Sequence, residues 1–248
     1  MRGHAEMNPR TVREMTLPPA GEAHVWEVNL CCDKATTAAC AAVLSPQELA
    51  RGERFRSGED AARFVAAHGH LRSILGAYAG VHASRITFSF SPHGKPSLDD
   101  AGRSPGLRFN MADSGDTALV AVTREREVGV DIERVDERVD LDAVSARCFS
   151  PAEQRCMMEA PGEDRVGLFF TLWARKEAYI KGRGEGMLLD LRSIDVSRAP
   201  ATIDGRWRID DIAARAGYRS AFSVDGGNGR FTMYAPEQSA GALFNQEQ

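Results

Sequence analysis

The chain reads Ser45-Pro46-Gln47-Glu48 in its first half and Ser150-Pro151-Ala152-Glu153 in its second, and this repeat decides the expected fold. Each stretch has a serine at the position that caps a helix, a proline at the first helical position and a glutamate at the third, which is the pattern of a capping box. A Gly-Glu-Asp triplet follows each stretch, at 58–60 and at 162–164. Capping boxes are common, but this shared order favours a duplicated unit over two unrelated helices.

Longer patterns extend the repeat. A helical pattern follows each triplet, over 61–78 and over 165–181, and glycines close both, at Gly80 and at Gly182 with Gly184. Strand patterns come next, over 85–91, 108–111 and 117–123 in the first half and over 193–196, 207–209, 219–224 and 230–234 in the second. We predict an α+β fold of two pseudo-symmetric halves, each a long helix packed on a small antiparallel sheet, with the active site at their junction.

The composition sets limits on function and location. The 248 residues are 43% hydrophobic and 27% charged with a net charge of −4, which does not point to nucleic acid as a partner. We expect a loose leader over 1–20 without signal-peptide character, halves over 21–124 and 125–235, and a flexible tail over 236–248. Five cysteines without a CxxC spacing favour a reduced, cytoplasmic setting, and no stretch is apolar enough to span a membrane.

Two carboxylates stand out in the stretch Glu127-Val128-Gly129-Val130-Asp131-Ile132-Glu133. Side chains alternate along a strand, so Asp131 and Glu133 share one face, beside a glycine that lets another backbone or a ligand come close. Such a pair forms half of a site for a hard cation. Taken alone, the pattern fits an ordinary strand with its polar face in solvent better.

The second long helical pattern carries ionisable side chains on its apolar stripe. Spacings of three and four residues align Phe170, Trp173, Glu177 and Lys181. Partly buried Glu177 and Lys181 next to an aromatic ring would have shifted pKa values and would suit acid–base chemistry. The alternative is a surface ion pair along the helix, which contributes only about 0.2–0.5 kcal/mol.

Basic residues supply candidates for phosphate binding. The segment Ser91-Pro92-His93-Gly94-Lys95-Pro96 predicts a tight turn with Lys95 at its tip, where an ammonium group suits a phosphate. A solvated lysine is the alternative. An arginine-rich stretch is the other source of positive charge, although helical arginines are more often simply exposed. Its members are Arg51, Arg54, Arg56, Arg63 and Arg72. Walker A, GxGxxG, GxSxG and zinc-type signatures are absent.

Each signal is weak alone, but their order is informative. The chain contains His93-Gly94-Lys95-Pro96, Phe109-Asn110 with Ser114-Gly115-Asp116, Gly129-Val130-Asp131-Ile132-Glu133, and Trp173-x-x-Lys176-Glu177-Ala178-x-x-Lys181. In this order the motifs resemble those of the larger phosphopantetheinyl transferases, the type that activates peptide synthetases. The resemblance covers about residues 25–234.

The resemblance implies an activity and its partners. It implies a monomeric, Mg²⁺-dependent enzyme, with Mn²⁺ as a substitute, that transfers the 4'-phosphopantetheine moiety of coenzyme A to a serine of an acyl or peptidyl carrier protein. The other product would be 3',5'-ADP. Such carriers serve fatty-acid, polyketide and nonribosomal peptide biosynthesis. Neither nucleic acid nor a membrane is expected as a partner.

The resemblance also assigns roles to single residues. Asp131, Glu133 and Glu177 would hold the metal, Glu177 would be the general base for the carrier serine, and Lys181 would sit at the phosphate under attack. Positioned cations, a metal and a base are what phosphoryl transfer requires. The remaining candidates would bind coenzyme A. They are Arg51, Arg63, Gly94, Lys95, Asn110 and Asp113.

One departure from the family pattern concerns the coenzyme site. The family usually has Ser-His where this chain has Ala112-Asp113, so an anion replaces an imidazole near the coenzyme phosphates. We favour a role for Asp113 at or near the metal, with activity intact. The alternative is a catalytically impaired module that still binds coenzyme A and the carrier protein. A metal-dependent phosphodiesterase built on Asp131 and Glu133 is a further alternative.

Overall fold

The computed structural model describes residues 15–99, 106–186, 189–226 and 229–235. The first half of the chain contains β1 (Glu22–Asn29), α1 (Lys34–Val43), α2 (Pro46–Gly52), α3 (Gly58–Ala79), the 3-10 turn η2 (Ala83–Arg85), β2 (Phe88–Phe90), β3 (Pro96–Leu98), β4 (Leu107–Ser114) and β5 (Thr117–Arg124). The second contains β6 (Val128–Arg134), α4 (Leu141–Cys148), α5 (Pro151–Glu159), α6 (Gly162–Arg183), the 3-10 turn η4 (Leu191–Ser193), β7 (Ala201–Ile203), β8 (Trp207–Ile212), β9 (Tyr218–Asp225) and β10 (Arg230–Tyr234).

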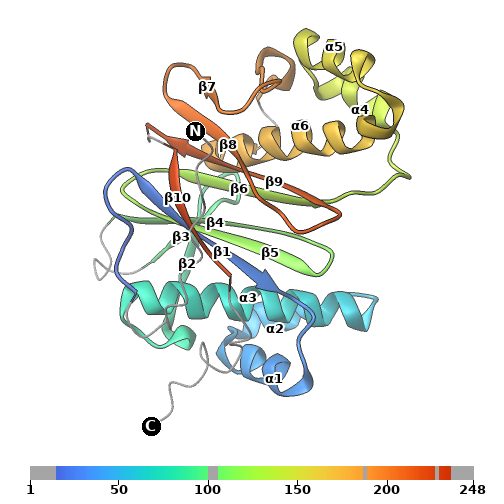
Figure 1. The fold of residues 1–248 in the computed structure, drawn as a ribbon. Coiled ribbons are helices and arrows are strands. Elements are labelled where there is room, and N and C mark those ends of the chain that lie inside the picture. The colour runs from blue at the N-terminus through green and yellow to red at the C-terminus, as the bar shows by residue number, and fades with distance from the viewer. Residues whose placement is uncertain (1–14, 100–105, 187–188, 227–228, 236–248) are drawn as a thin grey trace.

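These elements form four layers (Figure 1). Two four-stranded sheets, ordered β10-β1-β5-β4 and β6-β9-β8-β7, pack against each other through a shared apolar core. Helix α3 covers the outer side of the first sheet and α6 the outer side of the second, each over a core of its own. The order of strand, helix, capping-box helix, long helix and antiparallel strands occurs in both halves. The α+β class expected from the sequence is confirmed.

Both predicted capping boxes are present. The Ser45 side chain accepts from the Glu48 backbone, and the Glu48 carboxylate accepts from the Ser45 backbone at 2.8 Å. Ser150 and Glu153 make the same exchange, with the Ser150 N–H donating at 2.7 Å. The long helices end at Gly80 (φ 63°) and Gly184 (φ 68°), in the left-handed conformation that favours glycine, as expected. Gly182, which was also expected to close the second helix, lies inside α6.

Each capping-box glutamate also binds a buried cation of the following long helix. Arg72 Nε lies 2.8 Å from Glu48 Oε2, and Lys176 Nζ lies 2.9 Å from Glu153 Oε2. Each cation then donates to backbone carbonyls in or beside the 3-10 turn after its helix. The repeated contact supports the duplication. It also removes Arg72 from the arginines available to a phosphate, because its side chain is buried and its donors are used.

The strand expected over 193–196 is wrong. Leu191–Ser193 form η4, and the residues after it run outside any sheet. The backbone groups here bond to side chains instead of to a neighbouring strand: Lys176 donates to the carbonyl of Ile194 at 2.6 Å, and the Val196 N–H donates to Glu153 at 2.8 Å. The local sequence has a strand-like pattern, but it does not show that the distant side chains of Lys176 and Glu153 bind this backbone.

The first sheet joins both ends of the described chain. β1 pairs with β5 antiparallel and with β10 parallel, with Trp26 opposite Tyr234. Their rings stack with centroids 4.5 Å apart. β10 thus belongs to a sheet of the first half although it falls in the range expected for the second, and the boundary near residue 124 stays a prediction. The expected tail and most of the expected leader lie outside the described residues.

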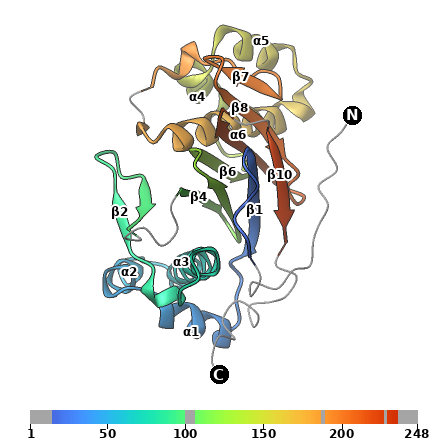
Figure 2. The same ribbon diagram turned by 90° about the vertical axis from the view of Figure 1, so that its left-hand side faces the viewer.

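The short hairpin of β2 and β3 lies outside the two main sheets. Figure 2 shows it rising from the layer of α3 towards α6. Its turn contains Gly94 in a left-handed conformation (φ 84°), and it closes through the Gly94 N–H and the carbonyl of Ser91. Within the described residues, no helix combines the length and apolar character needed to cross a membrane.

Candidate active site

The site is built where α6 crosses β6 at two glycines. A Cβ atom on Gly129 would overlap the carbonyl oxygen of Ala178 and the backbone nitrogen of Gly182, so the helix backbone rests directly on the strand. A Cβ atom on Gly182 would in turn lie 2.6 Å from Ser223 Oγ. This close approach brings the C-terminal half of α6 over the carboxylates of β6, as the glycine in the sequence led us to expect.

Asp131 and Lys181 meet at this crossing. Lys181 Nζ lies 2.5 Å from Asp131 Oδ1, and the Asp131 side chain is almost fully buried. Asp131 Oδ2 is buried without a hydrogen-bond partner. Burial alone would lower the pKa of Lys181, but the charges of Asp131, Glu177 and Glu133 outweigh it and raise that pKa above its usual value. The lysine is therefore held as a cation.

Glu133 is held by hydrogen bonds from both halves of the molecule. Trp173 Nε1 of α6 donates to Glu133 Oε1 at 3.1 Å, and Ser114 Oγ of β4 donates to Glu133 Oε2 at 3.4 Å. Burial, followed by the charge of Asp131, raises the pKa of Glu133 to about 7. Burial and the same aspartate also raise the pKa of Glu177. The three carboxylates thus share a region with more negative charge than Lys181 alone balances.

Side chains of β4 join the two sheets beside these carboxylates. Asn110 Oδ1 accepts from the Val130 N–H at 2.8 Å, and Ser114 Oγ accepts from the Arg134 N–H at 3.0 Å. Asn110, predicted as a coenzyme ligand, is therefore buried and uses its carbonyl oxygen to fix β6. In the structure Asn110 lies at the site and joins the two sheets by binding the backbone of β6.

Asp113 lies on the same stretch of β4, between these two junction residues. Its side chain is exposed, unlike that of its neighbour Ala112. Burial raises the pKa of Asp131, and among the smaller effects the negative charge of Asp113 adds to it. Asp113 thus acts electrostatically on Asp131, and its place at or near a metal stays a prediction.

A hard divalent cation fits the donor chemistry of this region. Among the residues that the structure describes, no three Asp, Glu, His or Cys side chains already form a group that could hold a metal ion. The unpartnered Asp131 Oδ2 is nonetheless a buried oxygen that lacks a donor or cation. Burial raises the pKa values of Glu133 and Glu177, and the negative charge of Asp131 adds to the rise. Oxygen ligands of this kind suit Mg²⁺.

Lys95 reaches the C-terminal end of α6 from the hairpin. Its Nζ donates to the carbonyl of Gly182 and to Glu127 Oε2, both at 2.5 Å. The side chain is mostly buried, and a Cβ atom on Gly184 would overlap it. A pocket of about 490 Å³ opens beside this lysine, between the hairpin and the start of β4. Lys95 is therefore not the freely solvated turn lysine of the alternative interpretation.

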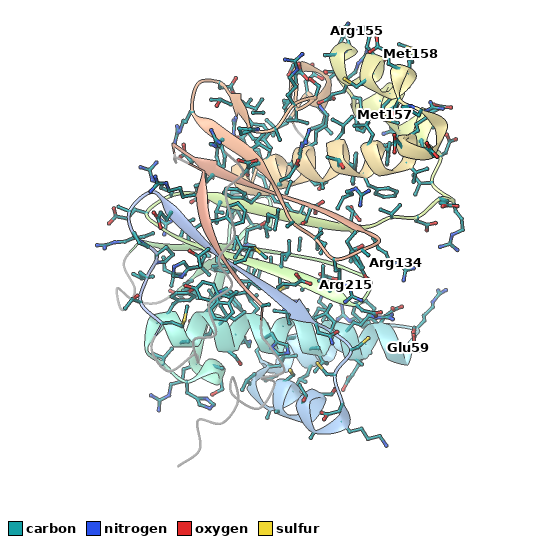
Figure 3. All side chains as sticks on the ribbon, in the orientation of Figure 1. Glu59, Arg134, Arg155, Met157, Met158 and Arg215 are labelled. Carbon is teal, nitrogen blue, oxygen red and sulfur yellow. The ribbon has the colours of Figure 1, made fainter. Side chains whose placement is uncertain are left out.

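Arg51 and Arg63 lie on the helices of the first half. Arg51 is exposed on α2, with its guanidinium 5.3 Å from the centroid of the Phe64 ring. Arg63 of α3 binds Asp116 in the β4–β5 turn at 2.9 Å and lies 3.6 Å from Glu59. Figure 3 labels Glu59 at the end of α3 opposite to the end where the hairpin rises.

Sequence reasoning missed four contributors to this region. Trp173 and Ser114 appeared in the motifs but were not predicted to hold Glu133, and Arg108 and Glu127 were not singled out as site residues. The spacing of Trp173 and Glu177 by one helical turn was the available signal for the tryptophan. For Ser114, Arg108 and Glu127 the sequence offers no local signal, because their partners lie on other strands and on the hairpin.

Comparison with known proteins identifies relatives of this chain. The family model described as the 4'-phosphopantetheinyl transferase superfamily matches residues 127–218, which include β6 and α6. The 4'-phosphopantetheinyl transferase HetI of Nostoc sp. is 38% identical over 179 residues, which cover 72% of this chain and 75% of HetI. The 4'-phosphopantetheinyl transferase Sfp of Bacillus subtilis is 30% identical over 153 residues, 62% of this chain and 66% of Sfp.

A human relative is more distant. The L-aminoadipate-semialdehyde dehydrogenase-phosphopantetheinyl transferase of Homo sapiens is 25% identical over 169 residues, which cover 65% of this chain and 55% of that protein. The matched share of these relatives therefore ranges from about half to three quarters of their length.

Proposed function

The chain belongs to the 4'-phosphopantetheinyl transferase superfamily, and we propose that it transfers the 4'-phosphopantetheine moiety of coenzyme A to a serine of an acyl or peptidyl carrier protein. The serine oxygen bonds to the phosphorus atom next to pantetheine. The bond between that phosphorus and the bridging oxygen breaks, and 3',5'-ADP leaves. The serine proton passes to a basic side chain of the protein. This reaction makes the protein a transferase.

The crossing of α6 and β6 carries this proposal. It brings Lys181 to Asp131, whose second carboxylate oxygen has no hydrogen-bond partner. Glu133 and Glu177 lie close enough for the charge of Asp131 to act on both. Phosphoryl transfer leaves little covalent chemistry to the protein and depends on positioning and on neutralising charge. The crossing offers both, because its ionisable groups stand on a helix and a strand whose backbones touch.

Asp131, Glu133 and Glu177 would hold Mg²⁺, which Mn²⁺ can replace. The bound cation would neutralise oxygens of the pyrophosphate. Trp173 and Ser114 fix the orientation of Glu133 for this task through their hydrogen bonds. Support comes from the buried, unpartnered Asp131 oxygen and from the negative charge of Asp131, which adds to burial in raising the pKa values of both glutamates.

Glu177 and Lys181 have separate tasks in the proposed reaction. Glu177 would accept the serine proton. Without a metal, burial and the charge of Asp131 raise its pKa. Lys181 would supply positive charge to the oxygens of the phosphate under attack. Its raised pKa keeps it protonated at neutral pH. The two residues lie one helical turn apart, so one rigid element sets their spacing.

Coenzyme A would be bound along the junction of the two halves. Lys95 and Gly94 belong to the hairpin beside the pocket, and Asn110 and Asp113 belong to the adjacent β4. Arg51 and Arg63 lie on the helices of the first half. Because Arg63 and Lys95 stand near opposite ends of the long helices, a single phosphate group is not expected to bind both.

The impaired binding module finds no support at the crossing. A decayed site is expected to lose one of its chemical groups, whereas Glu177 and Lys181 are both present and lie near Asp131. We also propose that the protein acts as a monomer in the cytoplasm, without nucleic acid or membrane. Its cysteines support the location, because all five are free thiols.

The release of 3',5'-ADP tests the reaction class. Coenzyme A and Mg²⁺ are incubated with the protein, with and without an apo carrier protein, and the nucleotide products are separated by chromatography. A transferase releases 3',5'-ADP in proportion to the apo carrier that is added. Release that is equally fast without a carrier would instead identify a phosphodiesterase and contradict the proposal.

A further inference from the structure

The pocket beside Lys95 contains an ion-pair arrangement that the site described above does not use. It holds about 490 Å³, and residues of the β2–β3 hairpin, of β4 and of the segment before β6 line it. Three of its lining side chains are charged, namely Lys95, Arg108 and Glu127. Two cations and one carboxylate leave the pocket with one net positive charge.

Glu127 bridges the two cations with one oxygen each. Lys95 Nζ lies 2.5 Å from Glu127 Oε2, and Arg108 Nε lies 3.1 Å from Glu127 Oε1. Each oxygen of the glutamate therefore pairs with one cation, as two oxygens of a phosphate group would. Its side chain is 42% exposed, so it can turn into solvent when another anion takes its place.

Both cations also make contacts that do not involve the glutamate. Lys95 keeps the carbonyl of Gly182 at 2.5 Å and that of Val128 at 3.4 Å. Arg108 keeps the carbonyl of Leu107 at 3.2 Å, through a different nitrogen from the one that faces Glu127. Displacement of Glu127 would thus leave a prepared pair of positive charges at the wall of the pocket.

We propose that Arg108 is, with Lys95, a phosphate ligand for the nucleotide half of coenzyme A, and that Glu127 occupies their place until the nucleotide displaces it. The inference rests on the proposed function for the identity of the ligand. An entering phosphate must replace two ion pairs, so Glu127 weakens nucleotide binding. A nucleoside without a phosphate cannot replace them, so the same exchange selects phosphorylated ligands.

Calorimetric titration with 3',5'-ADP in EDTA tests this inference. Glu127→Gln removes the competing charge, and 3',5'-ADP is expected to bind about five-fold more tightly, the effect of one charge at contact distance in water. Arg108→Gln is expected to weaken binding about five-fold, and Glu127→Gln should gain little in that background. Glu125→Gln is the matched control: it makes the same charge change nearby, outside the pocket lining, and should leave the affinity unaltered.

Ligands with fewer phosphates identify the group that is bound. The gain in affinity from Glu127→Gln should persist with one of the two monophosphates, 3'-AMP or 5'-AMP, namely the one whose phosphate binds Lys95 and Arg108. The gain should vanish with adenosine. Unchanged or weaker binding of 3',5'-ADP by Glu127→Gln would overturn the inference, since Glu127 would then only support Lys95. An equal gain with adenosine would overturn it too. Failure of the proposed function is a separate result: the wild-type protein would not modify an apo carrier, whatever the affinities of the variants.

Discussion

Lys176 Nζ lies 2.9 Å from Glu153 Oε2, and both side chains are fully buried. The next residue of the same helix, Glu177, belongs to the carboxylate group at Asp131. Adjacent residues of one motif therefore have different tasks. Lys176 holds α6 against α5 and the turn η4, whereas Glu177 and Lys181 supply chemistry at β6.

Lys176→Met is expected to destabilise the protein without touching the site directly. The substitution leaves the Glu153 carboxylate buried without its cation, which typically costs about 3–5 kcal/mol. Urea unfolding measures the change in the free energy of unfolding. A second variant combines Lys176→Met with Glu153→Gln and should recover part of the loss, because no charge remains buried. A single variant as stable as the wild type would show that the pair contributes nothing.

Gly129→Ala is expected to displace α6 from β6. A Cβ atom there overlaps backbone atoms of the helix, so the helix must move and the spacing of Lys181 from Asp131 must change. We predict a loss of stability of about 1–3 kcal/mol. Transferase activity should fall by more than the smaller fraction of folded protein accounts for. Gly162→Ala is the control, because a Cβ atom at Gly162 meets no atom within 4 Å. Equal activity of the two variants would contradict the role of the crossing.

The metal-free protein is expected to lose stability as the pH rises through the range set by Glu133. Burial raises the pKa of Glu133 from 4.5 to about 7, so between these values the folded protein binds more protons than the unfolded chain. Ionisation of this group should therefore remove about 1–3 kcal/mol between pH 4.5 and pH 7.5, allowing for partial solvent screening. Unfolding in EDTA at several pH values measures this.

The variant Glu133→Gln separates the effect of Glu133 on the pH dependence of stability from the effects of other titrating groups. The variant should lack this part of the pH dependence, and Mg²⁺ should reduce it in the wild type by favouring the ionised carboxylates. An identical pH dependence in the variant and the wild type would show that Glu133 ionises as an exposed glutamate does.

Asp113→His is expected to lower the KM for coenzyme A several-fold with little change in kcat. The substitution removes a negative charge that acts on Asp131 and restores the imidazole of the family pattern. Asp113→Asn removes the charge alone and should give a smaller gain. Steady-state kinetics with an unchanged or higher KM in Asp113→His would contradict this prediction.

Local sequence predicted those parts of the fold that local chemistry determines. The capping boxes at Ser45 and Ser150 and the glycine ends of α3 and α6 follow from the needs of helix termini. The alternation in β6 and the stripe on α6 drew attention to Asp131 and Lys181 as candidates, and the structure brings these two side chains together. Only the order of the motifs, through the family resemblance, indicated that they act in one site.

Distant hydrogen bonds determined what the sequence did not reveal. Residues 193–196 resemble a strand, but Lys176 and Glu153 take up their backbone groups. The parallel pairing of β1 with β10 joins segments from opposite ends of the chain. Lys95 has the sequence context of a solvated turn, yet its ammonium binds the end of α6.

Intact-mass spectrometry of an apo carrier protein tests the central claim most directly. The carrier is incubated with coenzyme A, Mg²⁺ and either the wild type, Glu177→Ala or Glu163→Ala, a control in the exposed first turn of the same helix. The account predicts that the wild type and the control add one phosphopantetheine group to the carrier, only with Mg²⁺, and that Glu177→Ala adds none. Transfer by Glu177→Ala at the wild-type rate, or no transfer by a wild type that still binds coenzyme A, would contradict it.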